Sequence, residues 1–104
     1  MAQTLADLTL ETFEPLVGTT FKVTAPDGAS AELKLTEVAK RMERVRSKRL
    51  TRQPFSLFFE GPPGVMLRQH TYEFEHPQLD GTLTIFVVPV GQLGDGYEYE
   101  AVFT

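Results

Sequence analysis

The chain has 104 residues, no cysteine and a formal net charge of −4. This length suits one domain whose apolar core forms without a structural metal, and the lack of cysteine excludes a disulfide framework and thiolate chemistry. The first residues, MAQTLADLTLE, show no basic stretch followed by an apolar run. We therefore expect no secretory signal and, by default, a cytoplasmic protein that could be incorporated into a larger or extracellular assembly.

Charge is distributed unevenly along the chain. Residues 40–52 contain one acid, Glu43, and seven basic side chains, for a net charge of +6, whereas the other residues together carry −10. The seven basic residues are Lys40, Arg41, Arg44, Arg46, Lys48, Arg49 and Arg52. This basic segment, residues 40–52, on an otherwise acidic chain is the strongest electrostatic feature of the sequence.

The chain begins with a predicted arm and a short helix. Residues 1–8 have weak patterning and predict a flexible arm. Thr9 can cap a helix over Leu10–Val17, because its hydroxyl can accept a free backbone N–H, and a proline within this range limits the helix to one or two turns. Apolar residues recur at helical spacing, so we expect Phe13 and Leu16 to plug an open end of the sheet.

Six further stretches alternate apolar and polar residues, the pattern of strands with one buried face. In chain order they are Thr19–Ala25, Ala31–Ala39, a run that begins at Pro54, Thr71–Glu75, Thr82–Val90 and Tyr97–Phe103. Turns rich in proline and glycine separate most of them. The alternation slips in the second stretch, where a β-bulge near Thr36–Glu37 would restore the register.

These elements predict an all-β domain over residues 9–104 with one short N-terminal helix. We expect a small antiparallel barrel or flattened sandwich of about six strands, joined as a meander, with an exposed basic loop at residues 40–53. The fifth strand is apolar on both faces from Ile85 onward, so we expect the helix to cover its outer face. The alternation assigns to the core Phe21, Leu33, Phe55, Leu57, Phe74, Leu83, Ile85, Tyr99 and Phe103.

The sequence offers few residues for catalysis. His70 and His76 are the only histidines, and strand alternation keeps them from converging simply with Glu73 on one metal. The three glycines of GQLGDG are not ordered as in a dinucleotide-binding loop and predict a hairpin turn. We therefore predict that the protein is not an enzyme and has no catalytic, cofactor-binding or metal-binding residues.

The basic segment remains as the candidate site, with three interpretations open. It could be a solvated loop, a contact to an acidic protein surface, or a site for nucleic acid or another polyanion. It has no aromatic residue that could stack on bases. Glu98 and Glu100 are most simply the solvated face of an edge strand, yet an acidic surface on a neighbouring copy could be formed by Glu73, Glu75, Glu98 and Glu100.

Several stretches resemble a known group of short bacterial proteins. They are LETFEPLVGTTFKV, PFSLFFEGP, the combination of YEFEHP with IFVVPVG, and the terminal YEAVF. The group is a domain of unknown function, DUF6916, and the resemblance spans most of residues 8–103. It implies a compact β domain with no catalytic residues to carry over, and an association with phage-tail-like or collar-type fibre proteins.

Together these observations favour a non-enzymatic structural or protein-interaction module, such as an accessory of a phage-tail-like or surface-fibre assembly. The expected partner is another protein or a second copy of the chain, and no cofactor is expected. The alternative is a module that binds nucleic acid or another polyanion through residues 40–52. The apolar runs are too short for a membrane-spanning helix, so we expect no membrane insertion.

Overall fold

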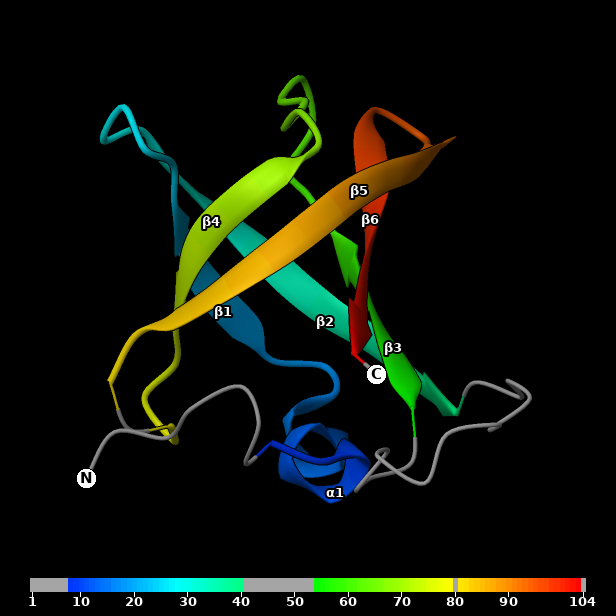
Figure 1. Ribbon diagram of the computed structural model, residues 1–104. Coiled ribbons are helices and arrows are strands. Elements are labelled where there is room, and N and C mark those ends of the chain that lie inside the picture. The colour runs from blue at the N-terminus through cyan, green and yellow to red at the C-terminus, as the bar shows by residue number, and fades with distance from the viewer. Residues whose placement is uncertain (1–7, 41–53, 80, 104) are drawn as a thin grey trace.

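The computed structural model describes residues 8–40, 54–79 and 81–103. Within these ranges the strands are β1 (Thr20–Thr24), β2 (Ser30–Lys40), β3 (Phe55–Glu60), β4 (His70–Glu75), β5 (Leu83–Leu93) and β6 (Gly96–Phe103). They form a closed antiparallel barrel in the order β1-β2-β3-β6-β5-β4, with β4 paired to β1 (Figure 1). The expected all-β class and the barrel of six strands are confirmed.

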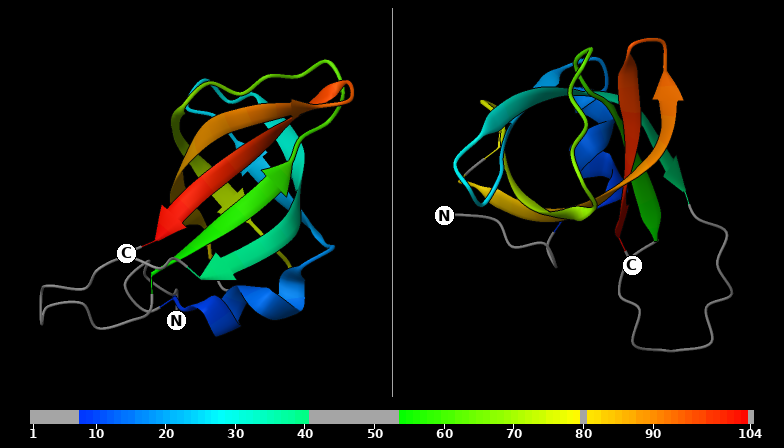
Figure 2. Two further views of the ribbon diagram at one scale, coloured as in Figure 1. Left: turned by 90° about the vertical axis from the view of Figure 1, so that its right-hand side faces the viewer. Right: turned by 90° about the horizontal axis from the view of Figure 1, so that it is seen from above.

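The connection between strands differs from the expected meander. β1-β2-β3 and β4-β5-β6 are each meanders, but β4 lies beside β1 and β6 lies beside β3. This is a Greek-key arrangement, and it requires the crossover, residues 61–69, to pass over one open end of the barrel (Figure 2). The meander prediction was wrong because alternation reports which face of a strand is buried, and not which strand lies next to it.

The N-terminal helix closes the other end of the barrel (Figures 1 and 2). It consists of α1 (Leu10–Phe13) followed by a 3₁₀ turn, η2 (Glu14–Leu16). Thr9 is the N-cap, as expected, and its backbone N–H donates to Thr12 Oγ1 at 3.2 Å. Because a proline tightens the second turn, the helix ends one residue before the predicted Val17.

Aromatic rings join this helix to the barrel. Phe13 is fully buried, and its ring centroid lies 5.9 Å from that of Phe55 and 5.7 Å from that of Phe103. Leu16 is also buried, so both residues plug the barrel end as predicted. Leu8, which the sequence assigned to the flexible arm, is fully buried with them, because the helix brings it onto the core.

The barrel core contains all nine residues that the alternation assigned to it. Two of them, Phe55 and Phe103, stack with their ring planes 4° apart. The predicted bulge is also present, because the register of β2 against β3 shifts between Leu35 and Glu37. Strand alternation therefore gave the buried face of each strand correctly.

The outer surface of β5 and the position of β6 require corrections. Phe86 and Val90 on β5 are 50% and 47% exposed, so the helix does not cover this face as expected. It lies across the barrel end instead (Figure 1). β6 is paired on both sides, to β3 and to β5, so Glu98 and Glu100 do not lie on an edge strand.

Two tyrosine hydroxyls hold the crossover to the barrel. Tyr99 has no exposed surface, and its hydroxyl accepts the Leu67 N–H at 2.8 Å. The Tyr72 hydroxyl donates to the Arg68 carbonyl at 2.8 Å. A Cβ at Gly61 would lie only 2.9 Å from the Tyr99 ring, so a residue without a side chain is needed where the crossover begins. Burial raises the pKa of both tyrosines.

Leu57→Ala tests the assignment of the buried face. Leu57 is fully buried in β3, so truncation should lower the free energy of unfolding by about 2–5 kcal/mol through lost burial and a residual cavity. Val17→Ala is the control, because Val17 is 43% exposed. Chemical denaturation measures both variants, and an unchanged midpoint for Leu57→Ala would contradict the assignment.

Tyr99→Phe tests the attachment of the crossover. The variant keeps the ring but removes the acceptor of the Leu67 N–H, which should cost about 1–3 kcal/mol and speed amide exchange at Leu67. Tyr97→Phe on the same strand is the control. Unchanged exchange at Leu67 in the Tyr99 variant would show that the hydroxyl does not hold the crossover.

The same variant has a signature in alkaline solution. Because the pKa of Tyr99 is raised above its ordinary value of 10.0 in the folded state, the unfolded chain ionises first as the pH rises. The stability contributed by the neutral phenol is therefore complete below about pH 10 and is lost as the pH approaches the raised pKa. Tyr99→Phe should lose less stability over this interval than the wild-type chain.

Candidate functional site

The structure describes one of the seven basic residues of the candidate site. Lys40 is exposed and is the last residue of β2, where it pairs with Phe55, the first residue of β3. Lys40 and Phe55 therefore lie at neighbouring positions on the barrel rim, at the end closed by α1 (Figure 1). Outside the described residues lie Arg41, Arg44, Arg46, Lys48, Arg49 and Arg52.

The outer surface of β3, β6 and β5 combines exposed apolar and acidic side chains. Strand pairing arranges them in rows that run across the strands. One row consists of Glu37, Phe58, Glu100 and Val88, and the next consists of Lys34, Glu60 and Glu98. A further pair is Ser56 with Val102. We call this surface the acidic–apolar face and define it by Phe58, Glu60, Phe86, Val88, Val90, Glu98, Glu100 and Val102.

Apolar side chains are prominent on this face. Phe86 and Val102 are 50% and 48% exposed, and Phe58 and Val88 are half-buried. Phe86 alternates with the buried Ile85 and Val87 along β5, so its ring lies on the outside of the barrel. Sequence reasoning missed this exposed face, because it expected the helix to cover β5.

The acidic residues of the face lie on the paired strands β3 and β6. Glu60 and Glu98 are directly opposed on β3 and β6, and opposed like charges on paired strands are destabilising. Lys34 is the neighbour of Glu60 on the other side. In the next row, the Ser56 hydroxyl donates to Glu100 Oε2 at 2.8 Å and orients that carboxylate. The face as defined therefore carries three carboxylates and no basic side chain, and Lys34 lies beside it on β2.

The four glutamates expected to form one acidic surface are divided between two. Glu73 and Glu75 lie on β4, where they are paired with Thr24 and Lys22 of β1. Glu98 and Glu100 lie on β6, and β5 separates the two strands. The expectation of a single surface was wrong, because β4 and β6 are not neighbours in the barrel. The sequence does not show which strands lie side by side.

The two histidines lie near opposite ends of β4. His70 is exposed at the crossover end, and its Nδ1 accepts the Thr71 N–H at 2.7 Å. His76 follows β4 at the helix end and is only 8% exposed, with its ring centroid 4.7 Å from that of Phe21. The sequence suggested surface or turn histidines, and His76 lies in a turn but is buried.

Both ring nitrogens of His76 are engaged. Nδ1 accepts the Gln78 N–H at 3.0 Å, so the ring proton is on Nε2, which donates to Thr19 Oγ1 at 2.8 Å. The Thr19 hydroxyl in turn donates to the Leu16 carbonyl. This chain of hydrogen bonds ties the end of β4 to η2 and the start of β1, and it gives His76 a structural role.

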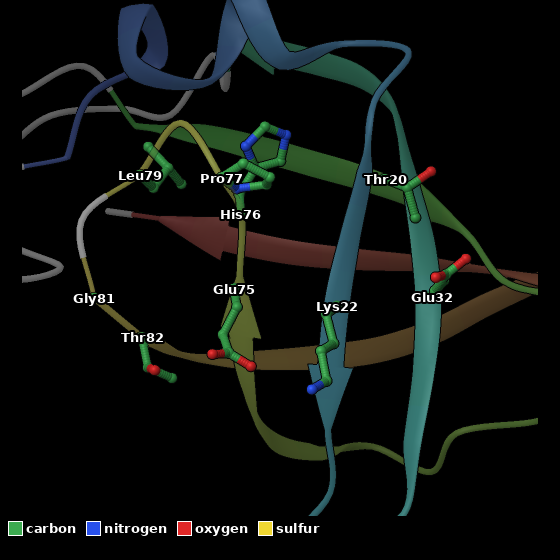
Figure 3. A pocket seen from close by; sticks show the side chains of 9 residues that line it. All are labelled: Thr20, Lys22, Glu32, Glu75, His76, Pro77, Leu79, Gly81 and Thr82. Atoms are coloured by element: carbon green, nitrogen blue, oxygen red, sulfur yellow. The ribbon is translucent and has the colours of Figure 1, made fainter.

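A shallow hollow of about 590 Å³ lies beside this histidine (Figure 3). Glu75 and Lys22, from the paired strands β4 and β1, line it together with Glu32. Both His76 nitrogens already have hydrogen-bond partners within the chain. In the described ranges, no three histidine or carboxylate side chains are arranged to hold a metal ion.

The fold and surface thus define a closed Greek-key β-barrel domain with an acidic–apolar outer face. The chain belongs to the family described as a domain of unknown function, DUF6916, whose model matches residues 8–103. No curated protein and no solved structure matches the chain. In the part of the chain that the structure describes, no helix has the length and apolar character to cross a membrane.

Thr19→Val tests the structural role of His76. The change preserves side-chain shape but removes the acceptor of the His76 Nε2–H and the donor to the Leu16 carbonyl. We expect a loss of about 1–3 kcal/mol in the free energy of unfolding. Thr20→Val is the matched control, because Thr20 is exposed on β1. Equal melting temperatures for the two variants would exclude this hydrogen-bond chain as a stabilising element.

Proposed function

We propose that this domain is a non-enzymatic protein-interaction module that binds an acidic surface of another protein subunit through its basic segment. The observation that carries the proposal is the separation of charge: seven of the ten lysines and arginines fall within residues 40–52, in a chain of net charge −4. Opposite charges on two surfaces steer association and fix the orientation of the partners.

The attachment of the segment to the barrel supports this proposal. Lys40 and Phe55 are paired residues at the ends of β2 and β3, so both ends of the intervening chain are held by a hydrogen-bonded sheet. A segment anchored at both ends loses less freedom on binding than a free tail of the same length. The closed barrel thus acts as a scaffold that presents the basic residues to a partner.

The proposal includes a structural role in a larger assembly, of which a phage-tail-like or surface-fibre complex is one form. A cytoplasmic site of synthesis fits this role. Binding of nucleic acid through residues 40–52 is the alternative function, favoured by the same positive charge. The acidic side chains of the described surface count against it, because they repel phosphates.

Replacing Arg44, Arg46, Lys48 and Arg49 together with serine tests this function. We expect the variant to fold like the wild-type chain and to form smaller assemblies, because surface charges contribute little to stability but govern association. Light scattering at low and high salt measures the mass, and the wild-type mass should fall as salt screens the charges.

A titration with duplex and single-stranded DNA distinguishes the two functions. Protein contact predicts a salt-sensitive mass with weak DNA binding. A mass that does not respond to salt, together with tight and salt-sensitive DNA binding, would reject the protein-contact function and establish the alternative.

A further inference from the structure

We propose that the acidic–apolar face is the docking surface for the basic segment of a second copy of this chain. This inference rests on the proposed function, since it takes the basic segment to be a protein-binding element. It adds the surface that the segment binds, the chemistry of the contact and the identity of the partner.

The first argument is the concentration of apolar surface on this face. Among the described residues, three of the six large hydrophobic side chains that are exposed lie here: Phe86, Val90 and Val102. Phe58 and Val88, both half-buried, lie in the adjoining row. Single exposed hydrophobic residues are common, but a group of them bordered by polar residues is typical of an interaction surface.

The second argument is the charge around these apolar residues. Glu60 and Glu98 face each other across two strands, and Glu100 lies in the next row beside Val88. If two copies packed this face against itself, these carboxylates would meet carboxylates of the same sign. The partner surface must therefore combine apolar side chains with positive charge.

The third argument is that this chain contains such a surface. Outside the basic segment, only three basic residues remain, Lys22, Lys34 and Arg68, whereas the segment itself has seven. The segment also contains three large apolar residues among its cations, Met42, Val45 and Leu50. Its composition thus complements both the acidic and the apolar groups of the face.

A second copy can make this contact twice. If each copy places its basic segment on the acidic–apolar face of the other, the two contacts are related by a twofold axis and the assembly closes as a dimer. Each contact places positive charge beside Glu60 and Glu98, which are directly opposed on β3 and β6.

The apolar part of the interface is tested with Phe86→Ser combined with Val102→Ser. Because both side chains are about half exposed, the variant should still unfold in one cooperative transition, with a somewhat lower melting temperature from the lost buried area, while its dimer association constant falls by about tenfold or more. The matched control, Val17→Ser with Met66→Ser, removes two exposed apolar side chains that lie outside the face. This control should associate like the wild-type chain.

The acidic part is tested with Glu60→Gln combined with Glu98→Gln. This pair should weaken the dimer by about tenfold and reduce its salt sensitivity, because it removes the charges that attract the segment. Glu73→Gln with Glu75→Gln removes the same number of charges from β4, outside the face, and should leave association nearly unchanged.

A mixing experiment tests the pairing of face and segment directly. The Phe86→Ser, Val102→Ser chain has an intact basic segment. The chain in which serine replaces Arg44, Arg46, Lys48 and Arg49, called the four-serine chain, has an intact acidic–apolar face. Each alone should be monomeric at a concentration where the wild-type chain is dimeric. Mixed in equal amounts, they should form a heterodimer with one of the two contacts, detected by sedimentation velocity with one chain labelled.

The possible failures are distinguishable. If the four-serine chain dissociates but the Phe86→Ser, Val102→Ser chain does not, the proposed function stands and the face is wrong. If the four-serine chain keeps the wild-type mass, both the proposed function and this inference fail. A wild-type chain that is monomeric at low salt, or a mixture that stays monomeric, also overturns the second copy as the partner.

Discussion

The closure of the barrel is the constraint on which the rest of the structure depends. Two pairings close it, β1 with β4 and β3 with β6, and both join strands that are distant in sequence. Neither can form unless the crossover spans one barrel end, and there Tyr99 binds the Leu67 N–H while its ring packs where only a glycine, Gly61, fits. At the opposite end, Phe13 contacts Phe55 and Phe103 and seals the core from the helix side. Long-range pairing of this kind costs loop entropy before it is rewarded, so both closures require support from side chains.

Much of the fold could be predicted because it depends on local sequence. The alternation identified the buried residues of each strand, and the slip at Glu37 identified a bulge, since a register with period two breaks visibly when one residue is added. The neighbours of each strand could not be predicted, because alternation contains no information about partners. For this reason β6 was taken for an edge strand, and the apolar outer residues of β5, such as Phe86, were assigned a cover that the helix does not provide.

The candidate site divides in the same way. The basic segment is a property of composition and was evident from the sequence, whereas the acidic–apolar face exists only because β6 lies between β3 and β5. That order brings Glu98 opposite Glu60 and places Glu100 between Phe58 and Val88. His76 shows the same limit in a single residue: its position in a turn was readable from the sequence, but its hydrogen bond to Thr19, 57 residues away, was not.

The acidic–apolar face and the basic segment each gather charges of one sign, and like charges repel one another in an isolated chain. Glu60 and Glu98 are directly opposed on paired strands, where like charges are unfavourable, and seven basic residues lie within thirteen positions of the sequence. Neither repulsion can be relieved by burial, since an unpaired charge is costly to remove from water.

Contact between the two kinds of surface relieves both repulsions, but exposed ion pairs alone contribute little and are screened by salt. In the contact that we propose, specificity therefore comes from the apolar residues that lie among the charges on each side. Phe86 and Val102 on the barrel, and Met42, Val45 and Leu50 in the segment, would exclude water from the contact and so strengthen the electrostatic attraction that brings the surfaces together.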